Sequence, residues 1–327
     1  MSTDIKQERA RHQGIAVDLP FEGSLPSFDG ATTWLNSSPL TPAALRGKVV
    51  LVQFWTYTCI NWRRTHPYVR AWARHYKDPG LVVIGIHTPE FAFEHALENV
   101  KQQAPAMGVD WPIAVDNDYE VWRAFANHYW PALYFVDAEG RIRHHRFGEG
   151  DYERSEMVIR QLLAAAGAKV PDGMAEVEAT GPEVEADWTD LRTPETYTGT
   201  DQAENFDASN PARLRLNHWS ISGDWTVRRD AIALNKTGGR IAFQFHARDL
   251  HLVMGPTPHA EAVRFRVLLD GTSAAPAHGS DVDAEGNGIV DQQRMYQLIR
   301  QKMPIEDRRF EIEFLDPGVE AFCFTFG

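Results

Sequence analysis

The stretch from Val49 to Trp62, VVLVQFWTYTCINW, joins a continuous apolar run to a single cysteine. The run that ends at Trp55 is rich in β-branched residues and does not alternate with polar ones. This pattern is typical of a strand buried on both faces, as in a parallel sheet. A helix is predicted from Cys59 to about Lys77, so the cysteine lies at a strand-to-helix junction.

Strands and helices alternate around this stretch. Strands are predicted at 81–86, 111–115, 132–136 and 141–147, and helices at 91–107, 119–128 and 155–166. The strand at 141–147 alternates polar and apolar residues, as an edge strand does. The order of elements predicts an α/β domain with a mixed sheet flanked by helices.

The 327 residues are enough for about two domains. We predict a polar N-terminal arm at 1–22, the α/β domain at 23–168, an acidic linker at 169–202 and an all-β domain at 203–327. Between Ala168 and Asn210, eleven acidic residues face two basic ones, whereas the whole chain carries −12. After the linker come short alternating strands with turns and no long helix, which predicts a jelly-roll β-sandwich.

Composition excludes several classes of protein. The chain is 43% hydrophobic and 24% charged, as soluble globular proteins are. Both domains are close to neutral, which argues against nucleic acid as a partner. No apolar run approaches the roughly 18 residues of a transmembrane helix. Residues 1–9 lack the apolar core of a secretory signal. With only two cysteines, these features predict a cytoplasmic protein as the sequence stands, or an extracytoplasmic one if a leader or anchor was removed.

Cys59 has the features of a reactive thiol. The free N–H groups and the dipole at a helix start favour the thiolate, and Arg63 and Arg64 add positive potential one turn later. Pro67, eight residues after Cys59, is predicted to kink the helix. Trp130-Pro131 precedes a strand and is a candidate for a cis peptide bond.

These features resemble the thioredoxin superfamily. More narrowly, four motifs resemble the redoxin domain of the DipZ family: Trp55–Asn61, Gly85–Phe91, Asp116–Tyr119 and Tyr129–Ala132. Three later motifs resemble the carbohydrate-binding-like C-terminal domain of that family: Leu216–Trp219, Gly223–Trp225 and Phe314–Phe322. The resemblance implies thiol–disulfide exchange with electrons from a membrane partner, because a membrane-embedded segment precedes these domains in DipZ proteins.

The sequence departs from this family at Trp62, which stands at the position of the second active-site cysteine. Gln53 likewise stands where thioredoxins carry a buried acid. Without a second cysteine in the motif, the chain cannot form its own disulfide there. The resulting prediction is a monothiol oxidoreductase that acts on a disulfide or a hydroperoxide through Cys59, with an external thiol to complete the cycle and no cofactor.

Two alternatives remain open from the sequence. The first alternative is a resemblance to peroxiredoxins, which carry the motif Pro-x-x-x-Thr-x-x-Cys. In this chain Thr56 matches the threonine of that motif, and Val52 stands in place of its proline. Peroxide reduction needs one low-pKa thiol that becomes a sulfenic acid. The other alternative is a non-catalytic binding protein, in which the β-sandwich recognises a glycan or a protein and the thioredoxin fold is a scaffold.

The catalytic residue is predicted to be Cys59. Its expected surroundings are Thr56, Thr58, Asn61, Trp62, Arg63, His87, Glu90, Trp130 and Pro131. Among these, Trp62 is interpreted as core or pocket wall rather than a catalytic group. His87 and Glu90 either line the pocket or belong to a loop that caps a helix.

The all-β domain offers weaker candidates. Asp281, Asp283 and Glu285 occupy positions 1, 3 and 5 of a pattern similar to a calcium loop, with glycine at position 6. Position 12 is not the usual glutamate, which favours a charged hairpin turn over a calcium site. Trp219 and Trp225 are candidates for a sugar-stacking platform, although at least one is expected in the core. Cys323 is predicted to be buried and inert.

Overall fold

The structure is a computed structural model that describes residues 18–208 and 213–327. The chain divides after Glu178 into two compact units. Most of the predicted polar arm, 1–22, lies outside the described residues. Each unit is built around its own sheets, and each is described by itself below.

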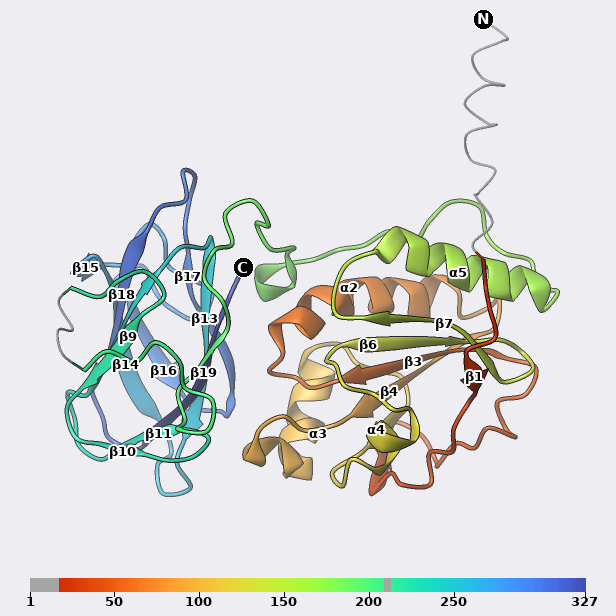
Figure 1. Cartoon of the computed structure of the whole chain (residues 1–327), viewed down its shortest axis with the longest axis horizontal. Helices are drawn as coiled ribbons and strands as arrows, with labels where there is room; N and C mark the ends of the chain where they lie inside the picture. Colours follow the sequence, from red (N-terminus) through yellow and green to blue (C-terminus); the bar gives the residue numbers. More distant parts are fainter. Residues whose placement is uncertain (1–17, 209–212) are drawn as a thin grey trace, which may run out of the picture. The chain divides into compact units, whose positions relative to one another are not determined.

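The first unit is a mixed sheet flanked by helices (Figure 1), which confirms the predicted fold class. The strands run in the order β1-β7-β6-β3-β4-β5-β2, with β3 parallel to β4 and β4 parallel to β5, and the remaining pairs antiparallel. The strands are β1 (Gly23–Ser24), β2 (Thr33–Leu35), β3 (Val49–Trp55), β4 (Leu81–His87), β5 (Ile113–Val115), β6 (Ala132–Val136) and β7 (Arg141–Phe147). The helices are α2 (Ile60–His75), η1 (Ala92–His95), α3 (Leu97–Ala106), α4 (Glu120–Ala124) and α5 (Tyr152–Ala165).

β3 is the central strand, and every one of its side chains is buried. Val50, Val52 and Phe54 face one core together with α4. The alternate residues face α2, where Trp55 stacks on Trp62. This double burial explains why the strand is apolar without alternation.

Gly85 of β4 allows close packing on the α2 side of the sheet. A Cβ atom at this position would lie 2.8 Å from Nε1 of Trp55 and 3.2 Å from Nε1 of Trp111. A side chain here would therefore push two buried indole rings away from the sheet. The glycine allows both indole rings to approach the backbone of β4 closely.

Two predicted helices are shorter than the sequence pattern suggests. The helix predicted at 91–107 is broken at Ala96, whose backbone is extended, into η1 and α3. The helix predicted at 119–128 ends early, because Ala126 adopts a left-handed backbone with φ 48°. Near these two places, the buried side chains of Glu94 and Asn127 bind backbone groups, at the start of η1 and after α4.

The start of the predicted linker is part of the first unit. Glu156 of α5 is buried and accepts hydrogen bonds from Nε1 of Trp72 at 2.9 Å and the hydroxyl of Tyr76 at 2.5 Å. Its carboxylate also accepts the backbone N–H of Ala175 at 2.6 Å. One buried carboxylate thus holds the segment after α5 against α2, which the acidic composition of the segment did not indicate.

The second unit consists of two antiparallel sheets, as expected for a β-sandwich (Figure 1). One sheet has the order β10-β11-β19-β13-β17 with β8 beside β19, and the other has the order β15-β14-β18-β12-β9 with β16 beside β14. Its elements are η2 (Gly181–Glu183), β8 (Thr196–Tyr197), β9 (Trp219–Ser222), β10 (Trp225–Val227), β11 (Ile232–Leu234), β12 (Arg240–Phe245), β13 (Asp249–Pro256), β14 (Val263–Leu269), β15 (Thr272–Ser273), β16 (Asn287–Val290), β17 (Arg294–Arg300), β18 (Arg308–Phe314) and β19 (Val319–Phe326). β8 lies inside the predicted linker, 169–202, so the sheet begins earlier in the chain than the composition indicated.

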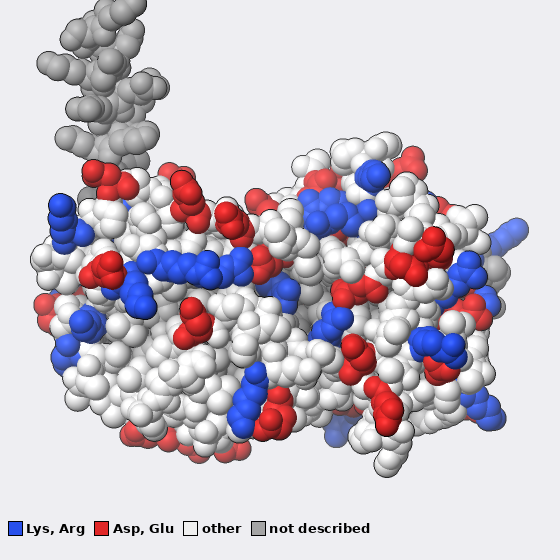
Figure 2. All heavy atoms as spheres, turned by 180° about the vertical axis from the view of Figure 1, so that it is seen from behind, with Lys and Arg blue, Asp and Glu red and all other residues white. Residues whose placement is uncertain are grey.

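The surface carries charges of both signs. On the face shown in Figure 2, basic and acidic side chains are interspersed over the described residues rather than gathered into one broad patch. None of the helices in the ranges 18–208 and 213–327 combines the length and the hydropathy that a bilayer-spanning helix needs.

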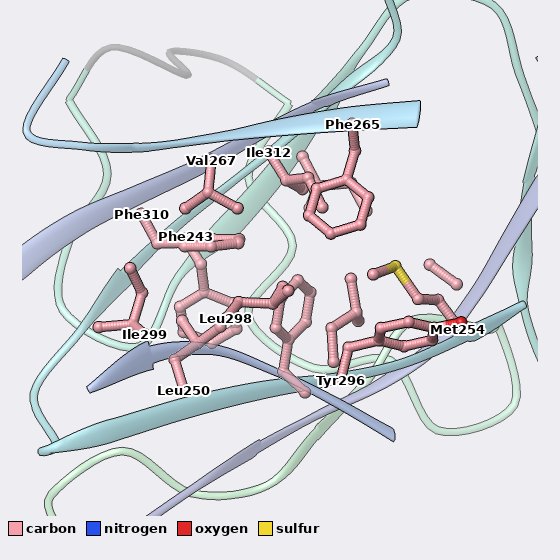
Figure 3. Packing of buried hydrophobic residues seen from close by; sticks show 14 of the residues in the cluster. Phe243, Leu250, Met254, Phe265, Val267, Tyr296, Leu298, Ile299, Phe310 and Ile312 are labelled. Carbon is pink, nitrogen blue, oxygen red and sulfur yellow. The ribbon is translucent and has the colours of Figure 1, made fainter. Parts of the chain in front are cut away.

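Aromatic and aliphatic side chains from both sheets fill the sandwich core. Phe243, Phe265 and Phe310 come from one sheet and meet Leu250, Met254 and Tyr296 from the other (Figure 3). Trp219 belongs to this core, and its Nε1 donates to the carbonyl oxygen of Glu204 at 2.8 Å. Trp225 packs against the core from the edge. The two indoles therefore do not form the exposed sugar-stacking platform considered from the sequence.

Candidate functional site

Cys59 lies at the edge of the sheet where β3 ends and β6 begins. It is the N-cap residue of α2, with extended backbone, and its side chain is partly exposed. Because β3 and β6 are antiparallel neighbours, Phe54 pairs with Ala132, and the residues just before β6 meet those just after β3. The Cys59 Sγ lies 3.8 Å from the carbonyl oxygen of Trp130. The Trp130-Pro131 peptide bond is cis, which confirms the prediction made from the sequence.

Trp130 is fixed in this position by two contacts. Its Nε1 donates to the carbonyl oxygen of Thr88 at 3.1 Å, and its ring packs on Trp122 with centroids 4.3 Å apart. Sequence reasoning placed Trp130 beside Cys59, and the carbonyl oxygen is the atom in contact. The S–H group of Cys59 donates weakly to this oxygen, which favours the neutral thiol and opposes the effect of the helix N-terminus.

Trp62 is fully buried beneath the cysteine. Its ring packs between Trp55, with centroids 4.6 Å apart, and His66, with centroids 4.8 Å apart. It therefore belongs to the wall between α2 and the sheet, as the sequence interpretation favoured. Both cysteines carry their sulfur as thiols. Cys323, in β19 of the other unit, is buried as predicted.

Glu94 is a buried carboxyl group beside the cysteine loop that sequence reasoning missed. Oε1 of Glu94 accepts the hydroxyl of Thr58 at 2.6 Å, and Oε2 accepts the backbone N–H groups of Glu90 at 2.6 Å and Phe91 at 3.0 Å. Burial raises the pKa of Glu94, while these hydrogen bonds and the side chain of Thr56 act against the rise. The sequence feature that could have indicated a buried Glu94 is its position as the single acid in an otherwise apolar segment, Phe91–Glu94.

His87 is completely buried at the end of β4. Its ring stacks on Tyr57, with centroids 5.8 Å apart, and meets Trp55 edge-on at 5.0 Å. Burial lowers the pKa of His87 to about 3, so the imidazole is neutral at physiological pH. The predicted site residue is thus a neutral wall of the site and not a cation near the thiol.

The remaining predicted neighbours occupy three kinds of position. Thr56 and Thr58 are buried in the loop before Cys59, whereas Asn61 and Arg63 are partly exposed on the first turn of α2. Glu90 contributes its backbone N–H to Glu94. Arg64 is buried in an ion pair with Glu149, with Nη1 and Oε1 3.1 Å apart. The positive potential expected from Arg64 is therefore largely neutralised by its partner.

The calcium-like loop of the second unit is organised as a turn. Asp283 accepts the backbone N–H groups of Glu285 and Asn287 at 3.0 and 2.7 Å. Asp281 instead accepts Nη2 of Arg294 at 2.8 Å. The part of the chain that the structure describes contains no cluster of three or more His, Cys, Asp or Glu side chains placed to hold a metal ion. The three acids predicted as weak ligands are not brought together.

Comparisons with known proteins agree with this architecture. A family model described as Redoxin matches residues 22–160, and one described as Thioredoxin like C-terminal domain matches residues 193–327. Protein DipZ of Mycobacterium bovis and of Mycobacterium tuberculosis is 38% identical over 265 residues, which cover 76% of this chain and 37% of the DipZ chain. Thiol-disulfide oxidoreductase YkuV of Bacillus subtilis is 29% identical over 140 residues, which cover 43% of this chain and 94% of YkuV. Among solved structures, a thioredoxin-like protein in the oxidised form is 30% identical and has a TM-score of 0.41, covering 44% of this chain and 96% of that one.

The fold and the matches define a thioredoxin-type protein related to thiol–disulfide oxidoreductases. The chain is a DipZ homologue, with a redoxin domain followed by a thioredoxin-like C-terminal domain. It spans 37% of the length of the DipZ relatives. The family resemblance drawn from the sequence motifs is thereby confirmed.

Proposed function

We propose that this chain is a monothiol oxidoreductase that reduces disulfides through Cys59 with the help of an external thiol. The observation that carries the proposal is the position of Cys59, a partly exposed cysteine at the N-terminus of α2. Two relatives, YkuV and ResA of Bacillus subtilis, are named thiol-disulfide oxidoreductases, which supports this class of substrate.

The first step is attack by the Cys59 thiolate on one sulfur of the substrate disulfide. A Cys59–substrate S–S bond forms, the substrate S–S bond breaks, and the departing sulfur leaves as a thiolate that takes a proton from water. The position of Cys59 at the N-terminus of α2 favours the anionic form of its sulfur through the helix dipole. The carbonyl oxygen of Trp130 holds the proton on the resting thiol until it is lost to solvent.

External thiols complete the reaction, because Trp62 occupies the position of an internal resolving cysteine. One external thiol attacks the Cys59 Sγ and releases the substrate as its second thiol. A second external thiol then displaces Cys59 and leaves in a disulfide with the first. The two electrons delivered to the substrate come from these two external thiols, and Cys59 returns to the thiolate.

A disulfide fits this site better than a hydroperoxide. Peroxiredoxins resemble this chain at Thr56, but the Thr56 side chain is completely buried, and Val52 replaces the proline of their motif. A hydroperoxide would convert Cys59 to a sulfenic acid and release an alcohol or water. A peroxide assay on the same protein distinguishes the two substrates.

The test is turnover of bis(2-hydroxyethyl) disulfide by the full chain with glutathione as the external thiol, followed as formation of glutathione disulfide. Intact-mass spectrometry should detect one 2-mercaptoethanol adduct on Cys59 during turnover. Cys59→Ser should abolish both the adduct and the turnover. Cys323→Ser is the matched control because it removes the only other thiol, which is buried in the sandwich, and it should retain activity.

Absence of an adduct on Cys59 in the wild-type chain would contradict the proposal. It would leave the redoxin domain as a scaffold and favour the binding-protein alternative. Loss of the thiol with hydrogen peroxide but not with the disulfide would assign the chain to peroxide reduction instead.

A further inference from the structure

A cavity of about 420 Å³ lies at the edge of the redoxin sheet where β3, β4 and β5 begin. Lys48 directly precedes β3, Leu81 is the first residue of β4, and Asp110 lies just before β5. Because these three strands are parallel neighbours, their first residues meet at one edge of the sheet. Cys59 follows the other end of β3, roughly 20 Å away along the length of that strand. The cavity is therefore separate from the thiol site.

Three cationic side chains line this cavity. Lys48 comes from the start of β3, Arg74 from the last turn of α2 and Lys77 from the loop after that helix, and all three are exposed. Within residues 18–208 and 213–327, none of these three side chains is hydrogen-bonded to a carboxylate or paired with one. By contrast, Arg64 and Arg141 of the same unit each form an ion pair with a carboxylate. The charges around the cavity are therefore available to a ligand.

The balance of charge around the cavity favours a doubly charged anion. Asp110 is the one acidic residue of the lining, so three cations and one carboxylate leave a net charge of +2. A phosphate monoester carries about −1.5 to −2 charges at pH 7, whereas a carboxylate carries one. Phosphate oxygens also accept charge-assisted hydrogen bonds from both lysine and arginine. A phosphate monoester thus matches the lining more closely than a carboxylate does.

Apolar side chains form the rest of the wall. Ala73 of α2, Val82 of β4 and Pro112 before β5 line the cavity, and each is partly exposed. Contact with such a surface removes the apolar body of a ligand from water and favours binding. The volume of the cavity falls within the range of small-molecule sites, about 300–1,000 Å³. The ligand that fits is therefore one small molecule with an anionic group and an apolar body.

We propose that this cavity binds a small phosphate monoester with an aromatic or apolar body. The cations hold the phosphate group, and the apolar wall contacts the body. This site goes beyond the proposed thiol chemistry and does not depend on it, because Cys59 lies at the opposite edge of the sheet. Ligand binding and turnover at Cys59 can therefore be measured separately on the same protein.

The test is isothermal titration calorimetry of the full chain at low salt with phenyl phosphate, inorganic phosphate, benzoate and phenol as probes. Phenyl phosphate should bind about tenfold more tightly than inorganic phosphate, as expected when roughly 60 Å² of apolar surface leaves water. Benzoate, with a single negative charge, should bind more weakly than phenyl phosphate, and the uncharged phenol should bind most weakly. Added sodium chloride should weaken the binding of phenyl phosphate more than that of phenol.

Substitutions of the charged residues should change the affinity in opposite directions. Lys48→Gln and Lys77→Gln should each weaken the binding of phenyl phosphate about three- to tenfold, because each removes a charged hydrogen-bond donor. Asp110→Asn should strengthen it by a similar factor, because it removes the carboxylate that repels the anion. Lys169→Gln is the matched control, since this exposed lysine does not line the cavity, and it should leave the affinity unchanged.

Three results would overturn the proposal. Equal affinities for phenyl phosphate and phenol would mean that the cations do not hold the ligand. Equal affinities for phenyl phosphate and inorganic phosphate would mean that the apolar wall does not contact it. A loss of affinity as large in Lys169→Gln as in Lys77→Gln would reduce the binding to general attraction between charges. None of these results alters the turnover expected at Cys59, so failure of this proposal and failure of the proposed function are distinguishable.

Discussion

Acidification should destabilise the redoxin domain through one buried imidazole. Burial lowers the pKa of His87 to about 3, with a smaller contribution from the positive charge of His95. In the unfolded chain the histidine titrates near its ordinary value of about 6.5. Below that pH the histidine of the unfolded chain binds a proton and that of the folded chain does not. The unfolding free energy therefore decreases as the pH is lowered from about 6.5 to about 3.

The magnitude follows from the difference between the two pKa values. One pKa unit corresponds to about 1.36 kcal/mol, and pH 5 lies about 1.5 units below the ordinary value, so His87 should cost about 2 kcal/mol there. Glu94 acts in the opposite direction. Its raised pKa means that the folded state takes up a proton more readily as the pH falls. The effect of His87 is therefore measured as a difference between the wild-type chain and a variant.

The assay is urea denaturation of the full chain at about pH 7.5 and about pH 5, with the two domains fitted as separate transitions. The acid-induced loss of unfolding free energy of the redoxin domain should be about 2 kcal/mol smaller in His87→Phe than in the wild type. His128→Phe, which replaces an exposed imidazole, is the matched control. Equal acid-induced losses in the wild type and His87→Phe would refute the reasoning.

Two further predictions concern the same domain. Trp62→Ala removes a fully buried ring between Trp55 and His66, and it should lower the unfolding free energy in urea by about 3–5 kcal/mol. The exposed Trp188→Ala is the control, and a loss below about 1 kcal/mol for Trp62→Ala would contradict the packing seen here. In the wild type, the raised pKa of Glu94 contributes to the unfolding free energy below about pH 4.5, and this contribution is lost as the pH rises through the raised pKa. Glu94→Gln should lack this pH-dependent contribution. Identical pH–stability curves for the two proteins would exclude that effect.

Local patterns were sufficient for the central strands of the sheet and for the position of Cys59 at a helix start. The unbroken apolar run at Val49–Trp55 marked the central strand, because burial on both faces leaves no polar alternation. Cys59 at the start of α2 and the cis bond before Pro131 followed from residues adjacent in the sequence. The boundaries of the domains stay predictions, and so does the catalytic role of Cys59, which the turnover experiment above addresses.

Contacts between residues far apart in the sequence could not be predicted from local patterns. Glu94 accepts a hydrogen bond from the hydroxyl of Thr58, 36 residues away in the sequence, and no local sequence pattern indicates this contact. The same carboxylate holds two backbone N–H groups at the start of η1, where the sequence pattern predicted one continuous helix and the structure has η1 and α3 separated at Ala96. Arg64, expected to favour a thiolate, finds Glu149 across 85 residues.

The sequence by itself determined the family, the order of strands and helices and the single thiol at a helix start, because periodicity and short motifs record local backbone preference. Only the tertiary structure decided what surrounds that thiol. It placed the carbonyl oxygen of Trp130 at the sulfur, buried Trp62 as a wall and kept His87 neutral. These features depend on side chains that meet from distant segments, where burial and hydrogen bonding outweigh local propensity.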